Sequence, residues 1–223
     1  GSPSELQFAF KVPEDITVKK WPTHARYGKR AGLENEHFLN SEMFTRLFYE
    51  PLQLYGARAA LYIFEFGTFP KSAFPSPHDF FEELDGFLSA LPEGGRYSVE
   101  IRNPEYLCPE YFAVLRSNGV AHAFNAWTRM PDLPTQTAIE DAYTAGFTVT
   151  RALLGRGRAY EEAVKSFEPY REVQAPLPET REALRALIER SLGQNRPAYI
   201  FVNNRLEGNA PGTIEAVVDS LAL

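Results

Sequence analysis

The stretch PAYIFVNNRLEGNAP at residues 197–211 decides the predicted fold. It begins as an apolar run of residues that favour β-strands and turns polar at Asn203. Folds built from parallel strands carry their chemistry on the loops that follow those strands. The stretch therefore predicts a buried strand that leads into a functional loop. It contains no motif that names a reaction, such as a phosphate-binding glycine loop, a nucleophile elbow or a zinc cluster.

Apolar, β-rich runs recur along the chain and alternate with amphipathic helical stretches. Six runs are predicted strands, at Gln7–Val12, Ala59–Phe66, Tyr97–Asn103, Ala121–Trp127, Phe147–Leu153 and Pro197–Asn203. Helical spacing marks Glu42–Leu54, His78–Leu91, Pro109–Ser117, Pro134–Ala145, Ala159–Glu168, Pro178–Leu192 and Thr213–Leu221. This alternation is typical of βα units around a parallel sheet, so we predict an α/β fold.

Composition narrows the class of protein. The chain has 223 residues, 44% of them hydrophobic, which is enough for a single domain over residues 1–223. A net charge of −6 argues against nucleic-acid binding over the whole surface, although a local basic groove stays open. A single cysteine, Cys108, excludes an internal disulfide and favours a reducing compartment. Because no run is long and apolar enough to span a membrane and no signal peptide is evident, we expect a soluble, cytoplasmic protein.

Two carboxylates are the leading candidates for catalysis. Alternation of apolar and polar residues places Glu65 and Glu100 near the ends of consecutive predicted strands, on the polar face. Two carboxyl groups placed in this way could divide general acid and general base work. The alternative is a buried ionic layer in which they pair with Lys11 and Arg102. We predict one shared cavity for Lys11, Glu65, Glu100 and Arg151.

Basic and polar side chains at the predicted strand ends are candidates for ligand binding. The cations among them are Lys11, Arg102, Arg151 and Arg205. Together they would suit a phosphate or carboxylate group, unless they only balance the charges of Glu65, Glu100 and Glu207. Asn125, Trp127 and Asn203 could contact sugar hydroxyls or rings, whereas we interpret Asn204 as a turn residue.

Two long segments follow the first two predicted strands and are expected over the site. These are Glu14–Asn40 and Gly67–Pro77, and long loops at this end of a barrel are usually functional. His24 lies in the first of them and is the histidine that we favour for ligand binding. The histidines match no metal-binding spacing, so we expect neither a metal nor a cofactor. Cys108 has no base near it in sequence and is interpreted as structural.

Several segments resemble, in order, the YecE-like family, which is the domain-of-unknown-function 72 group. They are FAFKVPEDIT at residues 8–17, the strand that ends in Glu65, VEIRN at 99–103, TVTRALLG at 148–155 and FVNNRLEGNAP at 201–211. The resemblance spans nearly the whole chain. It implies a TIM-type barrel, and it implies little about the reaction because the family has no established activity.

The chain departs from this family pattern in ways that affect its chemistry. Glu65 stands where the family often has Gln, and Arg205 stands where it has His. Arg151 is followed by ALLG and lacks the His of a common RxHG pattern. We therefore expect no mechanism that depends on those histidines.

The family also begins with two further strands, so the chain resembles a barrel without its first two strands. Uncovered edges of a parallel sheet invite association. We expect them to be covered by residues 14–40, by a second copy in a homodimer, or by residues outside this chain.

Two functions of different class fit these residues. We favour an enzyme of the hydrolase type that acts on an anionic, hydroxyl-rich small molecule or a nucleotide-like group, with Glu65 and Glu100 as acid and base. The alternative is a non-catalytic protein that binds a ligand or a partner through the same pocket. Carboxylates that meet over an open cavity would favour catalysis, and carboxylates capped by Arg and Lys would favour an ionic layer.

Overall fold

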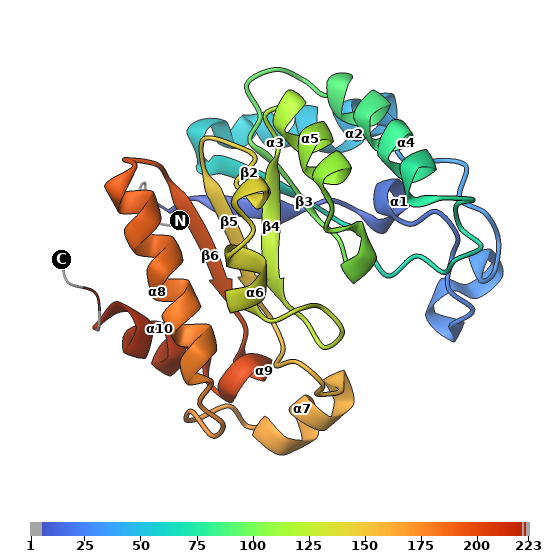
Figure 1. Ribbon diagram of the computed structural model, residues 1–223. Coiled ribbons are helices and arrows are strands. Elements are labelled where there is room, and N and C mark those ends of the chain that lie inside the picture. The colour runs from blue at the N-terminus through green and yellow to red at the C-terminus, as the bar shows by residue number, and fades with distance from the viewer. Residues whose placement is uncertain (1–5, 220, 222–223) are drawn as a thin grey trace. The chain divides into compact units, whose positions relative to one another are not determined.

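The computed structural model describes residues 6–219 and 221. The described residues form two compact units, residues 6–101 with 108–120 (unit 1) and residues 102–107 with 121–221 (unit 2). Each unit is built around three parallel strands with helices packed against them (Figure 1). No helix in the described part of the chain has the length and apolar composition to cross a membrane.

Unit 1 holds a sheet in the order β1-β2-β3. Its strands are β1 (Phe8–Lys11), β2 (Ala59–Glu65) and β3 (Tyr97–Glu100). Between β1 and β2 lie α1 (Glu14–Thr17), η1 (Ala25–Arg30), α2 (Ser41–Phe44), η2 (Thr45–Tyr49), α3 (Glu50–Leu52) and η3 (Gln53–Arg58). The longer helices are α4 (Pro77–Ser89) after β2 and α5 (Pro109–Ser117) after β3.

Helix α4 begins where the sequence supplies a start signal. The Asp79 carboxylate accepts hydrogen bonds from the Ser76 backbone N (2.6 Å) and hydroxyl (2.9 Å), and Pro77 occupies the first turn. These hydrogen bonds hold the pKa of Asp79 below its usual value. The apolar face of α4, which includes Phe80, Leu84 and Phe87, is buried. A local signal therefore sets the helix start, and burial of this face fixes the helix against the unit.

The core of unit 1 is largely aromatic. Phe44, fully buried at the end of α2, lies 5.1 Å from the Phe64 ring and 6.1 Å from the Tyr97 ring, measured between ring centroids. Phe64 in turn meets Phe87 of α4 edge-on at 5.1 Å. Helix α2 is thus held to β2, β3 and α4 by ring contacts, which add to the stability from buried area.

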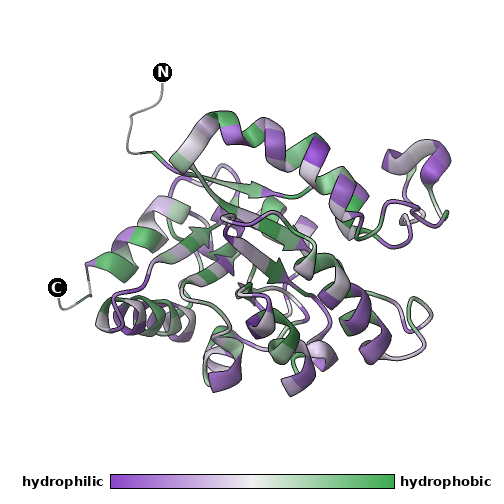
Figure 2. Ribbon diagram, turned by 90° about the horizontal axis from the view of Figure 1, so that it is seen from above, coloured by the Kyte–Doolittle hydropathy of each residue, from purple (hydrophilic) through white to green (hydrophobic). Residues whose placement is uncertain are grey.

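Unit 2 holds a sheet in the order β4-β5-β6. Its strands are β4 (Ala121–Ala126), β5 (Thr148–Ala152) and β6 (Ala198–Val202). Its helices are η4 (Pro104–Tyr106), α6 (Leu133–Thr137), η5 (Glu140–Ala142), α7 (Tyr160–Phe167), α8 (Pro178–Gly193), α9 (Asn204–Glu207) and α10 (Ala210–Val218). In Figure 2 the strands are mostly hydrophobic and the helices are striped, as expected for helices that cover a buried sheet.

The six predicted strands are all present, with ends that differ from the prediction by up to three residues. The helical predictions were less accurate. The single helix expected over Glu42–Leu54 is a run of four short segments that includes a π-helical turn and Pro51. The helix expected over Pro134–Ala145 is divided into α6 and η5. Helix α9 was not predicted, and α10 begins at Ala210, before the expected Thr213, because Asn209 caps it.

The prediction of a TIM-type barrel is wrong. In the described residues β1 pairs with β2 alone and β6 with β5 alone, so the sheet is open. A barrel closes only when its first and last strands pair with each other in a register that matches the tilt of the strands. In the part of the chain that the structure describes, β1 and β6 are the edge strands and do not pair with each other. The chain has an open parallel α/β fold.

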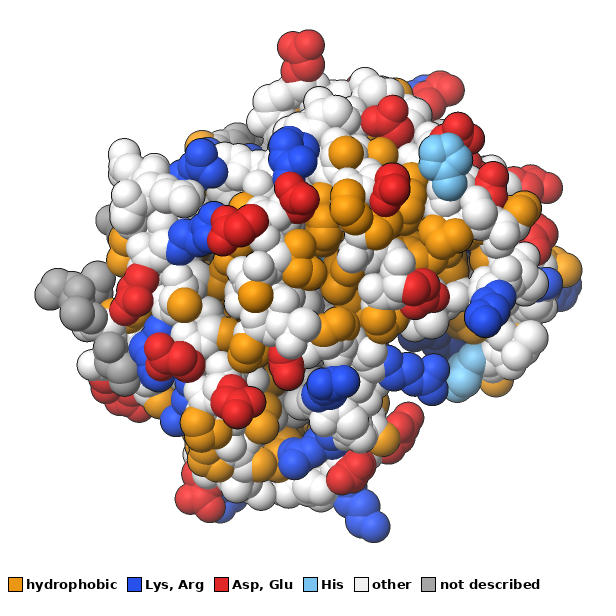
Figure 3. Space-filling model, viewed as in Figure 1, with side chains coloured by type: hydrophobic (Ala, Val, Ile, Leu, Met, Phe, Trp, Pro, Cys, Tyr) orange, Lys and Arg blue, Asp and Glu red, His pale blue; other side chains and the backbone are white. Residues whose placement is uncertain are grey.

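Charges are mixed on the surface seen in Figure 3. Acidic and basic side chains are interspersed there, with hydrophobic side chains between them. Such a face has no continuous basic area of the kind that binds nucleic acid nonspecifically.

Candidate functional site

Three charged side chains lie side by side where the strands of unit 1 end: Lys11, Glu65 and Glu100. We call this set, two carboxylates and the lysine beside them, the carboxylate row. The strand register pairs Glu65 of β2 with Glu100 of β3. The Nζ of Lys11, the last residue of β1, donates a hydrogen bond to Glu65 Oε1 over 3.0 Å. The Glu65 side chain is 12% exposed, whereas Glu100 is fully buried. The structure thus brings together three of the four residues predicted to share a cavity.

The surroundings of Glu100 are set by the strand ends and by α5. The Glu100 carbonyl accepts a hydrogen bond from the Phe66 backbone N (2.8 Å), which locks β2 and β3 together beside the row. Burial, aided by the charges of Glu100 and Cys108, raises the pKa of Tyr111 well above its usual value. The Tyr111 hydroxyl therefore stays protonated at neutral pH.

Cys108 has the environment of a structural thiol. Burial raises the pKa of Cys108, and a thiol that stays protonated is a poor nucleophile. This agrees with its interpretation from the sequence.

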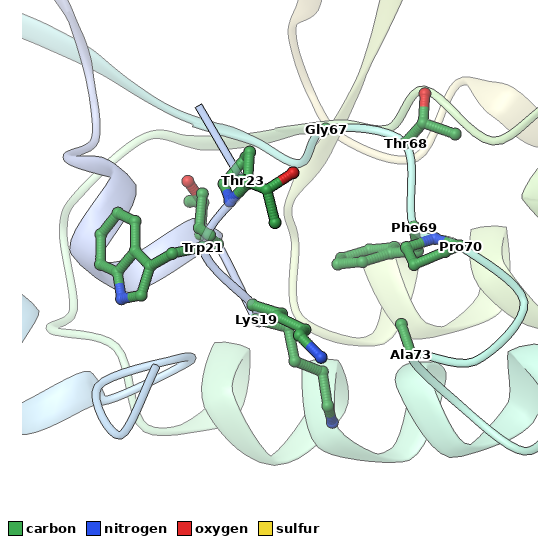
Figure 4. Close-up of a pocket in the computed structure, with 12 residues that line it drawn as sticks. Lys19, Trp21, Thr23, Gly67, Thr68, Phe69, Pro70 and Ala73 are labelled. Atoms are coloured by element: carbon green, nitrogen blue, oxygen red, sulfur yellow. The ribbon is translucent and has the colours of Figure 1, made fainter. Parts of the chain in front are cut away.

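A cavity of about 350 Å³ opens beside the strand ends of unit 1, between the loops that follow β1 and β2. Trp21 and Thr23 line one side, and Thr68 and Phe69 belong to the other (Figure 4). Gly67, which also lines it, lies two residues beyond Glu65. The lining is mainly apolar with a few hydroxyl groups, which suits a small organic molecule.

Contacts between the lining residues Lys19 and Trp21 and their neighbours hold the shape of the cavity. Lys19 Nζ bonds to Glu83 of α4 (2.9 Å) and lies 3.8 Å from the centroid of the Phe74 ring. The Arg30 guanidinium stacks on the Trp21 ring at 4.1 Å and also pairs with Asp15 (2.9 Å). The segment between β1 and α2 is therefore ordered by contacts within itself and by contacts of Lys19 with α4 and the loop before α4.

His24 is used for local structure. Its Nδ1 accepts a hydrogen bond from the Arg26 backbone N (3.2 Å), which caps η1. Its side chain is exposed, and it is not among the residues that line the cavity. The structure therefore does not bring His24 to the carboxylate row.

Other predicted ligand-binding residues lie in unit 2, after β3 and at the ends of β4, β5 and β6. The Arg102 guanidinium stacks on the Trp127 ring at 3.8 Å. Trp127 packs against a buried cluster of Leu154, Ala163 and Phe167. The stack places a cation and a large ring together just after β4.

Asn125 and Arg151 are register partners on β4 and β5. Asn125 is fully buried, and its backbone N and O both bond to the Gln136 side chain, at 3.1 and 2.7 Å. Because register partners have side chains on the same face of a sheet, Asn125 and Arg151 lie on one face of unit 2. The expectation that Arg151 shares the cavity of the carboxylate row stays a prediction.

The polar stretch after β6 is mainly structural. Asn203 Oδ1 accepts from the Arg205 backbone N (2.9 Å) and caps α9. Asn204 Oδ1 accepts from the Ala210 backbone N (2.8 Å). Asn209 caps α10, and its Nδ2 donates to the Tyr170 carbonyl (2.7 Å). The asparagines thus fold the chain end against the loop after α7.

Glu207 is the centre of this arrangement. It is fully buried and accepts hydrogen bonds from Arg181 Nη2 (2.7 Å), the Leu177 backbone N (2.6 Å) and Thr213 Oγ1 (2.8 Å). These hydrogen bonds tie α8, α9 and α10 together through one carboxylate. Loss of a donor would leave the buried negative charge of Glu207 with too few hydrogen bonds, so each donor is needed.

Replacement of Gly208 by Ala is expected to lower the free energy of unfolding by about 1–3 kcal/mol. Gly208 has φ = 112°, and a Cβ there would lie 2.9 Å from the Glu172 carbonyl oxygen, which is backbone and cannot move aside. The matched control is Gly193→Ala, at the end of α8, where a Cβ meets nothing within 4 Å. We expect this control to be neutral or stabilising by up to about 1 kcal/mol. Urea denaturation compares the two, and equal effects would contradict the strain argument.

Three residues that the structure makes prominent in unit 2 were not predicted from the sequence. They are Arg158 and Tyr160, after β5, and Arg181, the partner of Glu207. The segment GRGRAY at residues 155–160 could have revealed the first two, because it puts two arginines and an aromatic ring directly after a parallel strand. Within the described ranges no group of three or more His, Cys, Asp or Glu side chains could hold a metal ion.

Comparisons with known proteins agree on one family. The model of the family described as "Protein of unknown function DUF72" matches residues 2–223. The fold is similar to a DUF72 family protein from Thermotoga maritima, with a TM-score of 0.62 and 19% identity over 98% of this chain and 74% of that one. It is also similar to a DUF72 family protein from Enterococcus faecalis, with a TM-score of 0.63 and 15% identity over 99% of this chain and 76% of that one. No curated protein matches the sequence.

Proposed function

The chain belongs to the DUF72 family of unknown function. For this member we propose an enzyme of the hydrolase type, which acts on an anionic, hydroxyl-rich small molecule or a nucleotide-like group. The carboxylate row would supply the acid and base, and the cavity beside it would hold the substrate. The single cysteine supports a cytoplasmic location.

The observation that carries the proposal is the pairing of two carboxyl groups in unlike surroundings. Glu65 is partly exposed and lies 3.0 Å from the Lys11 ammonium, while Glu100 beside it is fully buried. Carboxyl groups whose environments differ can divide acid and base roles in one reaction. Glu65 is the member that water or a substrate group can reach from solvent.

The substrate class follows from what lies around the pair. Lys11 has 42% of its side chain exposed, so it can also face an anionic group of a ligand. The cavity lining combines the Thr23 and Thr68 hydroxyls with the Phe69 ring. Hydroxyls bind a polar, hydrogen-bonding ligand, and the ring contributes apolar contact as at many sugar sites.

One observation favours a second candidate, a non-catalytic ligand-binding protein. The Lys11 ammonium already caps Glu65, as expected if the row were an ionic layer of the fold. The cavity could then bind a ligand without turnover. The experiment that follows separates the two functions.

We expect Glu65→Gln and Glu100→Gln each to lower kcat/KM by about 100-fold or more, since positioned acid–base groups contribute that much. The assay is hydrolysis of chromogenic phosphate monoesters, phosphate diesters and glycosides by the full chain. The control is Glu42→Gln, which removes a carboxylate from an exposed ion pair of unit 1 away from the cavity, the Arg46–Glu42 pair at 3.3 Å. We expect this control to keep its activity within twofold.

Thermal unfolding of the same variants distinguishes catalysis from a structural role. A catalytic Glu100 predicts lost turnover with a melting temperature close to that of the parent. A buried ionic role predicts the reverse, because breaking a buried pair costs about 3–5 kcal/mol. Unchanged turnover with a large drop in melting temperature, or no turnover of any substrate by the parent, would overturn the hydrolase proposal in favour of ligand binding.

A further inference from the structure

Unit 2 carries a set of arginines stacked on aromatic rings, separate in its residues from the carboxylate row. This arginine–aromatic edge consists of Arg102, Trp127, Arg158, Tyr160, Phe167 and Arg205. Its members follow β3, β4, β5 and β6 in the chain, and helices α7 and α9 pack together there (Figure 1). Ligands of open α/β sheets bind outside the carboxyl ends of the strands, which is where this edge lies.

Arg158, in the loop after β5, is half-buried and lacks an acidic partner in the described chain. Its guanidinium lies 4.5 Å from the Phe167 ring. Its Nη1 is shielded from solvent and has no hydrogen-bond partner among the described residues. A shielded donor without a protein acceptor is costly, and a water, an ion or a ligand group can supply the acceptor.

Arg205, in α9, has the same character. Its guanidinium lies 4.5 Å from the Tyr160 ring, and it forms no ion pair or side-chain hydrogen bond within residues 6–219. Tyr160 is 46% exposed, so the stack lies at the surface. Stacking uses the face of the guanidinium and leaves its N–H donors, which lie in the plane, directed outward.

Three other arginines of unit 2 are paired with carboxylates of the chain itself. Arg181 pairs with Glu207, Arg185 with Glu182, and Arg190 with Glu140. Those three are helical and serve the fold through carboxylates that the chain itself supplies. Arg190 also lies over a ring, that of Tyr143, but it has Glu140 as an acidic partner. Arg158 and Arg205 have the ring contact without a carboxylate among the described side chains, and a ring orients a guanidinium without neutralising it.

We propose that the arginine–aromatic edge binds the phosphate groups of a phosphorylated small molecule, with Arg158 and Arg205 as the phosphate-binding residues. The planar fork of Arg matches two phosphate oxygens, and a ring-stacked Arg loses little side-chain entropy on binding. The chain carries a net charge of −6, so attraction of an anion must come from local groups such as these. The inference rests on unit 2 alone and does not require the reaction proposed for the carboxylate row.

Calorimetric titration of the full chain with inorganic pyrophosphate and with AMP tests the proposal. We expect Arg158→Met and Arg205→Met each to weaken binding at least tenfold, about 1.4 kcal/mol. Arg205→Lys keeps the charge without the fork and should give an intermediate loss. The matched control is Arg185→Met, which removes the same charge from an arginine already paired with Glu182, and it should change affinity less than twofold.

Three further outcomes are decisive. Circular dichroism and the melting temperature first establish that the Met variants are folded. If Arg205→Met is unfolded, the affinity of Arg205→Lys is used in its place. Equal losses for Arg185→Met and Arg205→Met, or no binding of either probe at 10 mM, would overturn the proposal. A single-stranded oligonucleotide that binds at least tenfold more tightly than AMP, with affinity rising with its length, would replace the small-molecule site with a nucleic-acid surface.

Discussion

Replacement of Glu207 by Gln is expected to lower the free energy of unfolding by about 3–5 kcal/mol, because it breaks a buried, multiply bonded ion pair on one side. The carboxylate accepts from Arg181 Nε and Nη2, the Leu177 backbone N and the Thr213 hydroxyl. A Gln amide offers a single acceptor oxygen, and its NH₂ group would face other donors. The Arg181 charge would then be left without its partner.

The matched control for this variant is Glu182→Gln. Glu182 also pairs with an arginine of α8, Arg185, but its side chain is 69% exposed. An exposed ion pair adds no more than about 1 kcal/mol to the free energy of unfolding, so the control should have nearly the stability of the parent. Guanidinium denaturation followed by circular dichroism measures both. A loss below about 1 kcal/mol for Glu207→Gln would show that the buried pair does not anchor the end of the chain.

Replacement of Phe44 by Ala is expected to destabilise unit 1 by about 3–5 kcal/mol, as for other large aromatic side chains removed from a core. Phe44 is fully buried and lies within 6.5 Å of the ring centroids of Phe64 and Phe87. Because these rings come from β2 and α4, they cannot all shift to fill the gap. A cavity would remain where α2 meets the sheet.

Leu54→Ala is the control for Phe44→Ala. Leu54 lies in η3, in the same connection between β1 and β2, and is 92% exposed. Its removal should change the free energy of unfolding by no more than about 0.5 kcal/mol. Near-equal effects of the two variants in urea denaturation would contradict the packing described for unit 1.

The positions of the strands could be predicted from the sequence because each depends on a short, local pattern. Alternation at β3, with Val99 opposite Glu100, is visible without any partner strand. The same alternation places Glu65 and Glu100 on one face, and parallel order then makes them register neighbours. The helix after β2 was equally legible, since Ser76, Pro77 and Asp79 form a start signal within four residues.

The roles of the polar residues after β6 could not be predicted in this way. The sequence suggested that Asn203 contacts a ligand, which stays a prediction, and it gave no sign that the Asn203 Oδ1 caps α9. Glu207 was considered only as a charge to be balanced, whereas its partner Arg181 is 26 residues away in sequence. Whether a polar group faces a ligand or another part of the chain depends on which distant segment packs against it.

Local patterns were enough to predict an α/β fold with six parallel strands and a pair of neighbouring carboxylates at their ends, because period-two alternation and capping act over a few residues. The open sheet, the role of Glu207 as an anchor, and the stacking of Arg158 and Arg205 on rings emerge from tertiary packing. Each of these depends on contacts between segments far apart in the chain. Edge pairing and long-range packing are selected by the free energy of the whole fold, and no local pattern encodes them.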